Sequence, residues 1–414
     1  MNYFSEDTFF YKSYKPSELL TKFGSPLYVY NEDILRKRAR DLKNLVDIPN
    51  YEVSYSIKAN SNLHILKILR EEGLHADAMS DGEIYVLNKA GFKNENIFYV
   101  CNNVSVDEMR YAHDRGIMIS VDSLSQLRTY GMNFPGTKVA VRLNPGIGVG
   151  HHQKVVTGGK ATKFGINLDM IQDIKTIACE FGLTISGINQ HLGSLFMSSS
   201  EYLRGVNELL ETALQFDDLE FLDFGGGFGI PYEKQNGQER LELIEFGKKL
   251  TEVLRNWQEI NNKHITFRCE PGRYIVAESS ILLGSVYAKK SNYEKLFIGT
   301  DIGFSVLIRP AMYGSHHDIE VYRNDELVRD EEKETVNITG NICESGDILA
   351  EERELPTIHE GDILGVMDAG AYGYSMSSNY NNRMRPAEVL ICSDGSLKLI
   401  RRRDNYEDLI RGFE

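Results

Sequence analysis

Residues 51–60 read Tyr51-Glu-Val-Ser-Tyr-Ser-Ile-Lys58-Ala-Asn60, a short β-like run that ends at a lysine. A lysine at the end of a buried strand loses part of its hydration, and burial of this kind lowers the pKa of its ammonium group. Such a lysine can act as a nucleophile or bind a carbonyl cofactor covalently. The alternative is an ordinary surface lysine that closes a strand, so the meaning of Lys58 depends on the rest of the chain.

Strand-like and helix-like segments alternate on both sides of this stretch. Strands are expected at residues 51–57, 76–79, 97–100, 117–121, 138–143, 184–190, 219–223 and 266–269. Helices are expected at 31–46, 63–72, 81–89, 106–115, 124–130, 168–181, 201–216 and 240–261. Eight short apolar strands that alternate with helices are typical of a (β/α)8 TIM barrel. We therefore predict an α/β chain with a barrel domain over residues 31–278.

The pattern changes after the eighth strand. Further strands are expected at 281–288, 295–299, 319–322, 335–339, 363–367, 388–392 and 397–402, and turn residues rather than helices separate them. This pattern indicates a β-rich second domain, a mainly antiparallel β-sandwich or barrel. We assign residues 279–414 to it, together with residues 1–30, whose strand at 26–30 lies outside the eight.

Charge and cysteine content exclude several classes of protein. The net charge of −14 argues against a general surface for nucleic acid or anionic membranes. The five cysteines are scattered and form no Cys-x-x-Cys motif, so we expect reduced thiols and no metal site. There is no apolar leader-like segment at the N-terminus and no run of 18 apolar residues, so a cytoplasmic location is expected.

Polar residues and glycines follow most of the predicted barrel strands. Because active sites of such barrels lie at the carboxyl ends of the strands, these residues should meet at one mouth. They are Lys58, Asp77, Arg142, His191 with Ser194, Gly225 to Gly227, and Glu270 with Gly272 and Arg273.

The three glycines after the seventh strand have two interpretations. Gly225, Gly226 and Gly227 can expose successive backbone N–H groups and form an anion-binding nest, to which the hydroxyl of Ser194 could add a donor. Phosphate sites in these barrels recur in the loops after strands seven and eight. The alternative is a tight turn. A dinucleotide fingerprint is excluded, because the Gly-x-Gly-x-x-Gly spacing is absent.

The charged residues at the mouth also have alternatives. His191 is either a core histidine or a ring that lies against an aromatic cofactor. Glu270 either caps a short helix or bonds to the nitrogen of a pyridine ring. Arg273 either neutralises Glu270 or pairs with a carboxylate or phosphate. A lysine, a phosphate nest, a stacking histidine and an acid for a ring nitrogen together describe pyridoxal 5'-phosphate.

In their order and number, these motifs resemble those of the barrel-type, alanine-racemase-like (fold III) pyridoxal-phosphate decarboxylases. The resemblance covers nearly the whole chain. In the second domain it is carried by Ile308-Arg-Pro-Ala-Met-Tyr313, Cys343-Glu-Ser-Gly-Asp347 and residues 370–380. It implies that Lys58 holds pyridoxal phosphate as a Schiff base. It also implies that Tyr372 binds this cofactor together with the residues of the barrel mouth.

The resemblance further implies a carboxy-lyase that converts meso-2,6-diaminopimelate to L-lysine and CO2, the last step of lysine biosynthesis by the diaminopimelate route. Arg273, Arg309 and Tyr313 would bind the distal carboxylate of the substrate, and Glu344 its distal amino group. Tyr372 would contact both cofactor and substrate. Cys343 would be the proton donor, reaching the site from the partner subunit of a homodimer.

Other interpretations stay open. Without the resemblance, Arg309 would be expected at a surface turn, Cys343 as a small buried residue and Tyr372 in the core. The chain could also be a related decarboxylase of carboxynorspermidine, ornithine, lysine or a D-amino acid, a racemase, or a non-catalytic cofactor-binding relative. His75 and Asp81 stand where the family more often has small residues. The long stretch Asn144–Lys163 is expected to be a lid or a specificity loop.

Overall fold

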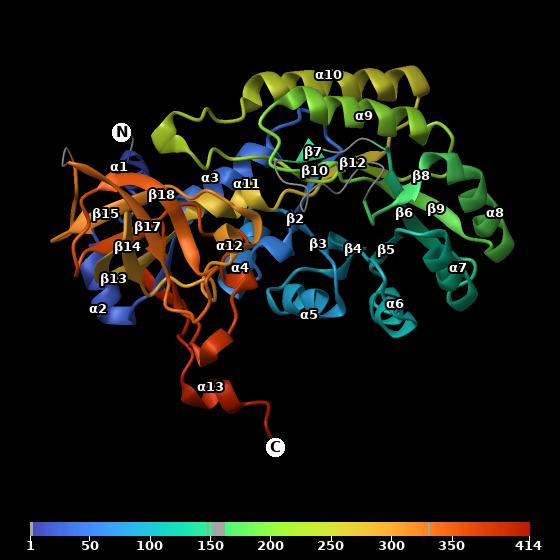
Figure 1. Cartoon of the computed structure of the whole chain (residues 1–414). Helices are drawn as coiled ribbons and strands as arrows, with labels where there is room; N and C mark the ends of the chain where they lie inside the picture. The colour runs from blue at the N-terminus through green and yellow to red at the C-terminus, as the bar shows by residue number, and fades with distance from the viewer. Residues whose placement is uncertain (1–2, 147–148, 151–161, 330–331) are drawn as a thin grey trace. The chain divides into compact units, whose positions relative to one another are not determined.

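The computed structural model describes residues 3–146, 149–150, 162–329 and 332–414, and its elements are labelled in Figure 1. The chain divides into two compact units. One contains Arg36–Ile230 and Arg240–Tyr274 and is called the barrel unit below. The other contains Met1–Leu35, Pro231–Glu239 and Ile275–Glu414 and is called the β-rich unit.

The barrel unit is a closed parallel β-barrel, as predicted. Its strands pair in the order in which they occur in the chain, and the last pairs with the first. They are β2 (Tyr51–Ser56), β3 (His75–Ala78), β4 (Ile97–Val100), β5 (Met118–Val121), β6 (Lys138–Asn144), β9 (Thr184–Asn189), β11 (Phe221–Asp223) and β12 (Thr266–Cys269). Each of the eight predicted strands overlaps one of these, so the fold class is confirmed.

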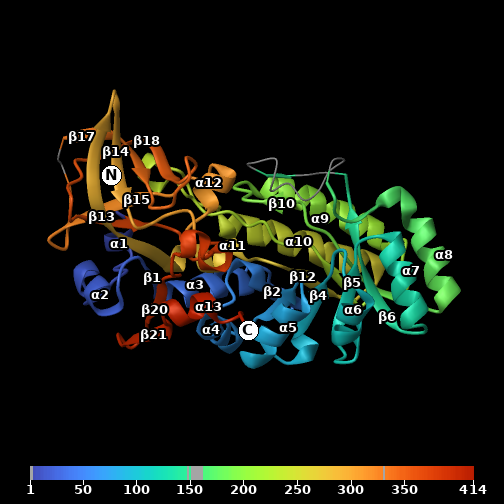
Figure 2. The ribbon, with the colours of Figure 1, turned by 60° about the horizontal axis from the view of Figure 1, so that its bottom comes forward.

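Helices lie around the outside of these strands (Figures 1 and 2). They are α3 (Glu32–Lys43), α4 (Leu63–Glu71), α5 (Asp81–Lys89), α6 (Val106–His113), α7 (Leu124–Asn133), α8 (Ile171–Phe181), α9 (Ser199–Ala213) and α10 (Leu243–Asn261). Serine side chains cap several of them: Ser80, Ser105 and Ser123 each accept a hydrogen bond from a backbone N–H three residues later. Caps at the starts of these helices fix where each strand-to-helix loop ends.

A charged cluster joins β2 to β12, where the barrel closes. Arg268 Nε donates to Glu52 Oε2 at 2.8 Å, and His75 Nδ1 lies 3.3 Å from the same oxygen. Burial alone would raise the pKa of the Glu52 carboxyl, but the hydrogen bonds and charges of His75 and Arg268 lower it to about 2. His75 lines a cavity of about 600 Å³ with Ser54 and Arg268.

The β-rich unit is built on one twisted sheet around the long strand β13 (Ser280–Asn292). Most of its strand pairs are antiparallel, as predicted; β1 with β20 and β14 with β17 are parallel. The strands are β1 (Leu27–Asn31), β13, β14 (Lys295–Thr300), β15 (Ile319–Arg323), β16 (Glu326–Leu327), β17 (Lys333–Thr339), β18 (Ile348–Pro356), β19 (Ile363–Val366), β20 (Ala387–Ile391) and β21 (Leu397–Arg401). The early strand β1 lies between β13 and β20. Strand β18 and the short helices α1 (Phe4–Asp7) and α2 (Pro16–Phe23) were not predicted.

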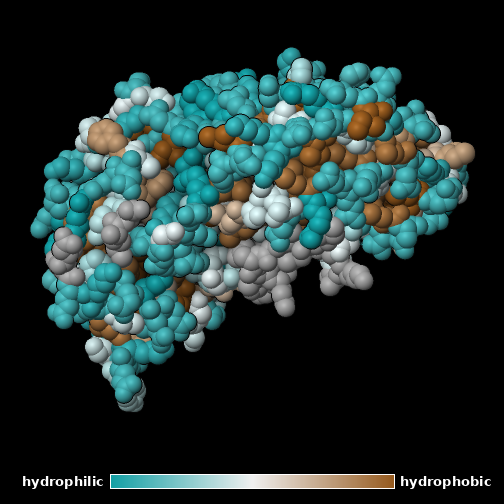
Figure 3. Space-filling view, turned by 90° about the horizontal axis from the view of Figure 1, so that it is seen from above, coloured by the Kyte–Doolittle hydropathy of each residue, from teal (hydrophilic) through white to brown (hydrophobic). Residues whose placement is uncertain are grey.

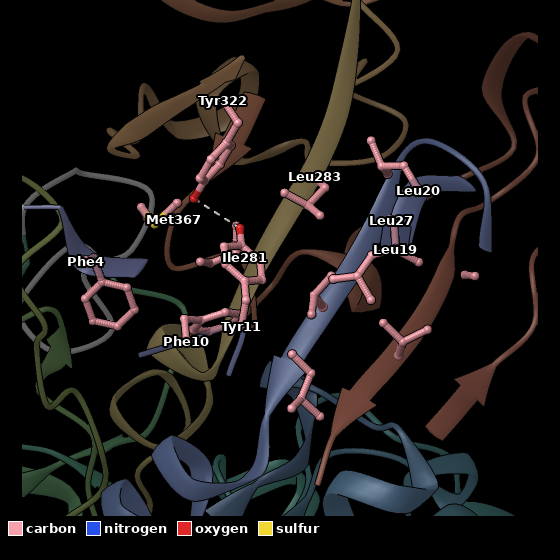
Figure 4. Close-up of a cluster of buried hydrophobic side chains, with 14 residues drawn as sticks. Phe4, Phe10, Tyr11, Leu19, Leu20, Leu27, Ile281, Leu283, Tyr322 and Met367 are labelled. Atoms are coloured by element: carbon pink, nitrogen blue, oxygen red, sulfur yellow. Dashed lines mark hydrogen bonds between the residues drawn. The ribbon is translucent and has the colours of Figure 1, made fainter. Parts of the chain in front are cut away.

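The core of the β-rich unit draws on both ends of the chain. Figure 4 shows aromatic side chains from the N-terminal segment facing residues of β13, β15 and the end of β19. Phe10 is fully buried, and the hydroxyls of Tyr11 and Tyr322 lie 3.2 Å apart. Burying rings of this size stabilises a fold strongly, so Phe4, Phe10 and Tyr11 tie the N-terminal segment into this unit's core.

Hydrophilic side chains cover most of the surface seen from above, and apolar ones appear in patches between them (Figure 3). Several exposed apolar residues belong to α10 or follow α9, including Leu214, Ile244 and Ile260. No helix among the described residues is both long enough and apolar enough to cross a membrane.

The Glu52 cluster gives a prediction for acid stability. Because the pKa of Glu52 is lower in the folded chain than in the unfolded one, its contribution to stability is present above about pH 4.5 and is lost as the pH falls towards 2. Glu52→Gln should therefore cost about 1–2 kcal/mol at pH 7, allowing for partial exposure, and much less near pH 2. Urea unfolding at several pH values measures this.

Glu95→Gln is the matched control, because Glu95 forms an exposed pair with Lys93. It should change the free energy of unfolding by less than about 0.5 kcal/mol at any pH. A constant cost of Glu52→Gln from pH 7 to pH 2 would contradict the proposed role of the cluster.

Candidate active site

Lys58 lies in a single 3-10 turn (Ile57–Ala59) directly after β2, and its side chain is exposed. Lys58 therefore follows β2, as predicted, but its exposed side chain lacks the expected desolvation. The turn packs against the loop after β12: Ser56 N–H donates to Pro271 O at 3.1 Å. A Cβ at Gly272 would lie 3.0 Å from Ala59 Cβ, so a glycine lets this loop approach the lysine turn.

Three buried carboxylates lie at the same end of the barrel. Asp77 is in β3, Asp223 ends β11 and Glu270 follows β12. Each has one oxygen to which no N–H or O–H group of the described residues donates: Asp77 Oδ1, Asp223 Oδ2 and Glu270 Oε1. The side chains of Asp223 and Glu270 also bond to each other, as two carboxyls that share a proton do. Buried carboxylate oxygens are rarely left unsatisfied in native proteins, so the cluster indicates a site for a hydrogen-bond donor.

Burial and neighbouring charges raise the pKa of each of the three carboxyls in this cluster. Burial and then the charge of Asp223 raise the pKa of Glu270, while Lys58 and Arg142 oppose the rise. Burial raises the pKa of Asp223 to about 7. Burial and then Glu270 raise the pKa of Asp77. Like charges this close cannot all ionise without a cationic partner, and a protonated ring nitrogen beside Glu270 would supply one.

His191 follows β9 and bonds to the glycine loop. Its Nδ1 accepts a hydrogen bond from Gly226 N–H at 3.1 Å, so the ring hydrogen is on Nε2. Burial, followed by the charges of Lys58 and Arg142, keeps the pKa of His191 well below its usual value. A neutral ring held by one edge in this way suits a flat contact with an aromatic cofactor.

The glycines after β11 allow neighbouring backbone segments to pack closely, and they form less of an anion-binding nest than predicted. Gly225 N–H donates to Asp223 Oδ1, and Gly226 N–H donates to His191 Nδ1. At most the third N–H, from Gly227, can then face an anion, so the expectation of three exposed donors is wrong for the first two. A Cβ at Gly226 would lie 2.1 Å from Glu270 O, and one at Gly227 would lie 2.4 Å from Gly193 O.

The loop that carries Ser194 is next to these glycines. Phe196 N–H donates to Gly227 O at 3.0 Å, and the short strand β10 (Gly193–Ser194) pairs with β7 (Val149–Gly150). Ser194 is therefore held near Gly227, where its hydroxyl can add a donor for a phosphate. Arg273 follows Gly272 as the first residue of α11 (Arg273–Val276) and is buried.

Two charged residues at this mouth were given no role from the sequence. Arg142 lies near the end of β6 with its guanidinium carbon 4.5 Å from the centroid of the Phe164 ring, and its charge lowers the pKa of both Glu270 and His191. Asp223 bonds Gly225 and raises the pKa of Glu270. Both could have been recognised in the sequence, because each is a charged residue near the carboxyl end of an otherwise apolar barrel strand.

The residues present fit pyridoxal phosphate. Glu270 is a buried carboxyl that bonds to the Asp223 side chain, and no N–H or O–H group of the described residues donates to its Oε1. Such a carboxyl could hold a proton on a pyridine nitrogen. The loops of Gly226 and Gly272 leave no room for side chains, and the exposed amine of Lys58 lies at the same mouth. Among the described residues, no group of three or more His, Cys, Asp or Glu side chains is arranged to hold a metal ion.

The predicted substrate residues all belong to the β-rich unit, except Arg273. Arg309 begins α12 (Arg309–Tyr313) and is 2% exposed, so the surface-turn alternative is wrong. Tyr313 follows it by one helical turn. Tyr372 is half-buried in a left-handed backbone conformation, with φ of 57°.

Cys343 and Glu344 are exposed, so the alternative of a buried Cys343 is also wrong. Cys343 N–H donates to Asn381 Oδ1 at 2.8 Å, and Tyr380 O–H donates to Glu344 Oε1 at 2.9 Å. These two contacts hold the pair in one turn with their side chains available to a ligand or another chain.

Three further features of the sequence are His75, Asp81 and the predicted lid. His75 lines the cavity with Ser54 and Arg268 described above and pairs with Glu52, so its departure from the family pattern concerns barrel closure. Asp81 begins α5, where its Oδ1 accepts from Gly82 N–H. Most of the predicted lid Asn144–Lys163 lies outside the described residues.

Comparison with known families and enzymes gives a consistent result. The family described as "pyridoxal-dependent decarboxylase, pyridoxal binding domain" matches residues 32–277. The diaminopimelate decarboxylase of Methanothermobacter thermautotrophicus is 42% identical over 404 residues, which cover 95% of this chain and 93% of that enzyme.

Solved structures agree with these sequence matches. One crystal structure of a diaminopimelate decarboxylase is 32% identical and superposes with a TM-score of 0.88, covering 95% of this chain and 94% of the other. The Helicobacter pylori diaminopimelate decarboxylase in complex with L-lysine is 30% identical, with a TM-score of 0.85 and coverage of 95% and 98%.

The mouth geometry predicts the result of removing the lysine. Lys58→Ala should abolish the visible absorbance band of bound pyridoxal phosphate and lower turnover by about a thousandfold or more, because it removes the amine that would bind the cofactor covalently. Absorbance after reconstitution and gel filtration measures the first effect. An unchanged band would show that another residue holds the cofactor.

The close approach at Gly226 predicts weaker cofactor binding when a side chain is added. Gly226→Ala places a Cβ against Glu270 O and should raise the dissociation constant of pyridoxal phosphate by about tenfold or more. Gly412→Ala is the control, since a Cβ there meets nothing within 4 Å. Titration of the apoenzymes compares them, and equal affinities would contradict the role of the loop.

Proposed function

The chain belongs to the diaminopimelate decarboxylase family of pyridoxal-dependent decarboxylases, and on that basis we propose that it converts meso-2,6-diaminopimelate to L-lysine and CO2. The observation that carries the proposal is the buried carboxyl pair of Glu270 and Asp223 at the same barrel mouth as the exposed Lys58. The M. thermautotrophicus and H. pylori enzymes support the choice of substrate.

Pyridoxal phosphate, when bound, supplies an electron sink for the pair of electrons left on the α-carbon as CO2 departs. Lys58 Nζ would hold the cofactor, and Glu270 would keep a proton on its ring nitrogen. The neutral His191 would contact the cofactor ring. The glycine loop, Ser194 and Arg273 would bind its phosphate.

The β-rich unit supplies the groups for the other end of the substrate. Arg309 and Tyr313 bind the distal carboxylate with Arg273, and Glu344 binds the distal ammonium group. Cys343 Sγ–H donates the proton that replaces the lost carboxylate on the α-carbon. Tyr372 contacts both the cofactor and the substrate. A substrate without the distal carboxylate leaves these buried donors unmatched, which discriminates strongly against it.

We further propose that the enzyme works as a cytoplasmic homodimer with shared sites. Cys343 and Glu344 are exposed in the single chain, as expected for residues that complete the site of a second copy. All five cysteines are free, which suits a reducing compartment. The barrel unit would then bind the cofactor of one subunit while this turn comes from the other.

The direct test of substrate is a set of parallel incubations with pyridoxal phosphate. Release of CO2 from meso-diaminopimelate with formation of L-lysine is expected, and kcat/KM for ornithine or L-lysine should be lower by about 10⁴-fold. Comparable turnover of ornithine would contradict the assignment. Inversion of the α-carbon without CO2 release would indicate a racemase.

A mixing experiment tests the shared site. Lys58→Ala and Cys343→Ala chains should each be nearly inactive, whereas an equal mixture that exchanges subunits should recover about a quarter of wild-type activity. The recovery arises because half of the dimers are mixed and each of these has one intact site. No recovery from a mixture shown to contain mixed dimers would place Cys343 and Lys58 of one site in the same chain.

A further inference from the structure

We propose that His317 and Tyr232 are positioning residues that fix the guanidinium of Arg309 for the distal carboxylate of the substrate. The inference rests on the proposed function, in which Arg309 binds that carboxylate. It adds two residues to which neither the motifs nor the mouth geometry gave a role. All three residues belong to the β-rich unit.

The guanidinium of Arg309 is held along one edge. Its Nη1 lies 2.7 Å from His317 Nε2, and its Nη2 donates to Ser315 Oγ at 3.3 Å. Arg309 and His317 are each 2% exposed. A buried arginine with its neighbouring donor groups bonded in one plane has little rotational freedom left, which suits paired recognition of a carboxylate.

The tautomer of His317 is set by a main-chain carbonyl. His317 Nδ1 lies 2.7 Å from Met367 O, and because a carbonyl oxygen only accepts, Nδ1 carries the ring hydrogen. Nε2 must then be the acceptor for Arg309. Two further bonds hold this pair in place: Met367 N–H donates to Asp318 O at 2.9 Å, and the side-chain Nη2 of Arg353 donates to His317 O at 2.8 Å.

Tyr232 closes the arrangement from a separate segment. The Arg309 Cζ lies 4.6 Å from the centroid of the Tyr232 ring, and the His317 ring meets the same ring edge-on at 5.3 Å and 76°. A cation over an aromatic face gains further stabilisation when both are buried. The ring therefore restricts the arginine on a second side, out of the plane of its hydrogen bonds.

A buried ion pair anchors the segment of Tyr232. Lys234 Nζ donates to both oxygens of Asp368, at 2.8 and 2.6 Å, and lies 3.5 Å from Glu278. Asp368 directly follows Met367, whose carbonyl holds His317. One short stretch thus fixes both neighbours of Arg309.

Loss of this positioning should weaken the binding of ligands that carry the distal carboxylate and should not affect ligands that lack it. L-Lysine keeps the distal carboxylate of meso-diaminopimelate, whereas cadaverine has the same carbon chain and two amines but no carboxylate. Loosening Arg309 should weaken binding of L-lysine and leave binding of cadaverine unchanged. A variant that damages the site in general should weaken both.

The test compares His317→Leu with His317→Gln in the holoenzyme. A glutamine can accept from Arg309 and donate to Met367 O, and leucine can do neither. His317→Leu should raise the inhibition constant of L-lysine and the KM of meso-diaminopimelate by about tenfold or more, with kcat within about threefold. His317→Gln should restore most of the loss. The inhibition constant of cadaverine should stay the same throughout.

His113→Leu is the control, because His113 stacks on Phe134 in the barrel unit at 4.3 Å and takes no part in substrate binding. Tyr232→Leu keeps the bond between Arg309 and His317, so it provides an independent variant if His317→Leu does not fold. It should show the same selective loss. Circular dichroism and cofactor absorbance check that each variant is folded and loaded.

Equal losses for L-lysine and cadaverine, or unchanged L-lysine binding in both His317→Leu and Tyr232→Leu, would overturn the inference. Calorimetric titration of the holoenzyme with L-lysine gives the same comparison without turnover. If wild-type enzyme binds L-lysine but releases no CO2 from meso-diaminopimelate, the proposed function fails while the positioning role is still tested by the titration.

Discussion

Buried negative charge at the barrel mouth is the constraint on which the active site depends. Asp77, Asp223 and Glu270 are buried together, Asp223 and Glu270 bond to each other, and the cations Arg142 and Lys58 oppose the repulsion at Glu270. Removing three carboxylates from water is costly unless they are paired or protonated. A cofactor with a protonated ring nitrogen would supply a partner for Glu270. The buried carboxyls of the barrel mouth therefore favour a ligand with a cationic group.

The loops around these carboxylates pack so closely that the glycines in them contact the neighbouring loops directly. Gly226 lies against Glu270 O, and Gly272 lies against the turn of Lys58, so neither position has space for a side chain. His191 joins the two sides by accepting from Gly226 N–H. Because each loop follows a different barrel strand, closure of the barrel sets the distances between the lysine, the acid and the histidine. The ion pair of Glu52 and Arg268 between β2 and β12 stabilises that closure.

Much of this was predictable from the sequence, because apolar runs of four to six residues mark buried parallel strands. All eight barrel strands were located in this way, and their carboxyl ends located Lys58, Asp77, His191 and Glu270. Strand β18 was missed because Glu351 to Glu354 is a run of charged residues, and strand patterns are weak where neither face is strongly apolar. The partners of Gly225 and Gly226 were not predictable, since a sequence does not show which backbone N–H groups are already bonded.

The account predicts a protonated pyridine nitrogen held by Glu270, and this is its central claim. The most direct measurement is the ¹⁵N NMR chemical shift of pyridoxal phosphate labelled at the ring nitrogen and bound to the enzyme. The account predicts the shift of a protonated pyridinium in the wild-type enzyme and that of a neutral pyridine in Glu270→Gln. A neutral pyridine shift in the wild-type enzyme would contradict it.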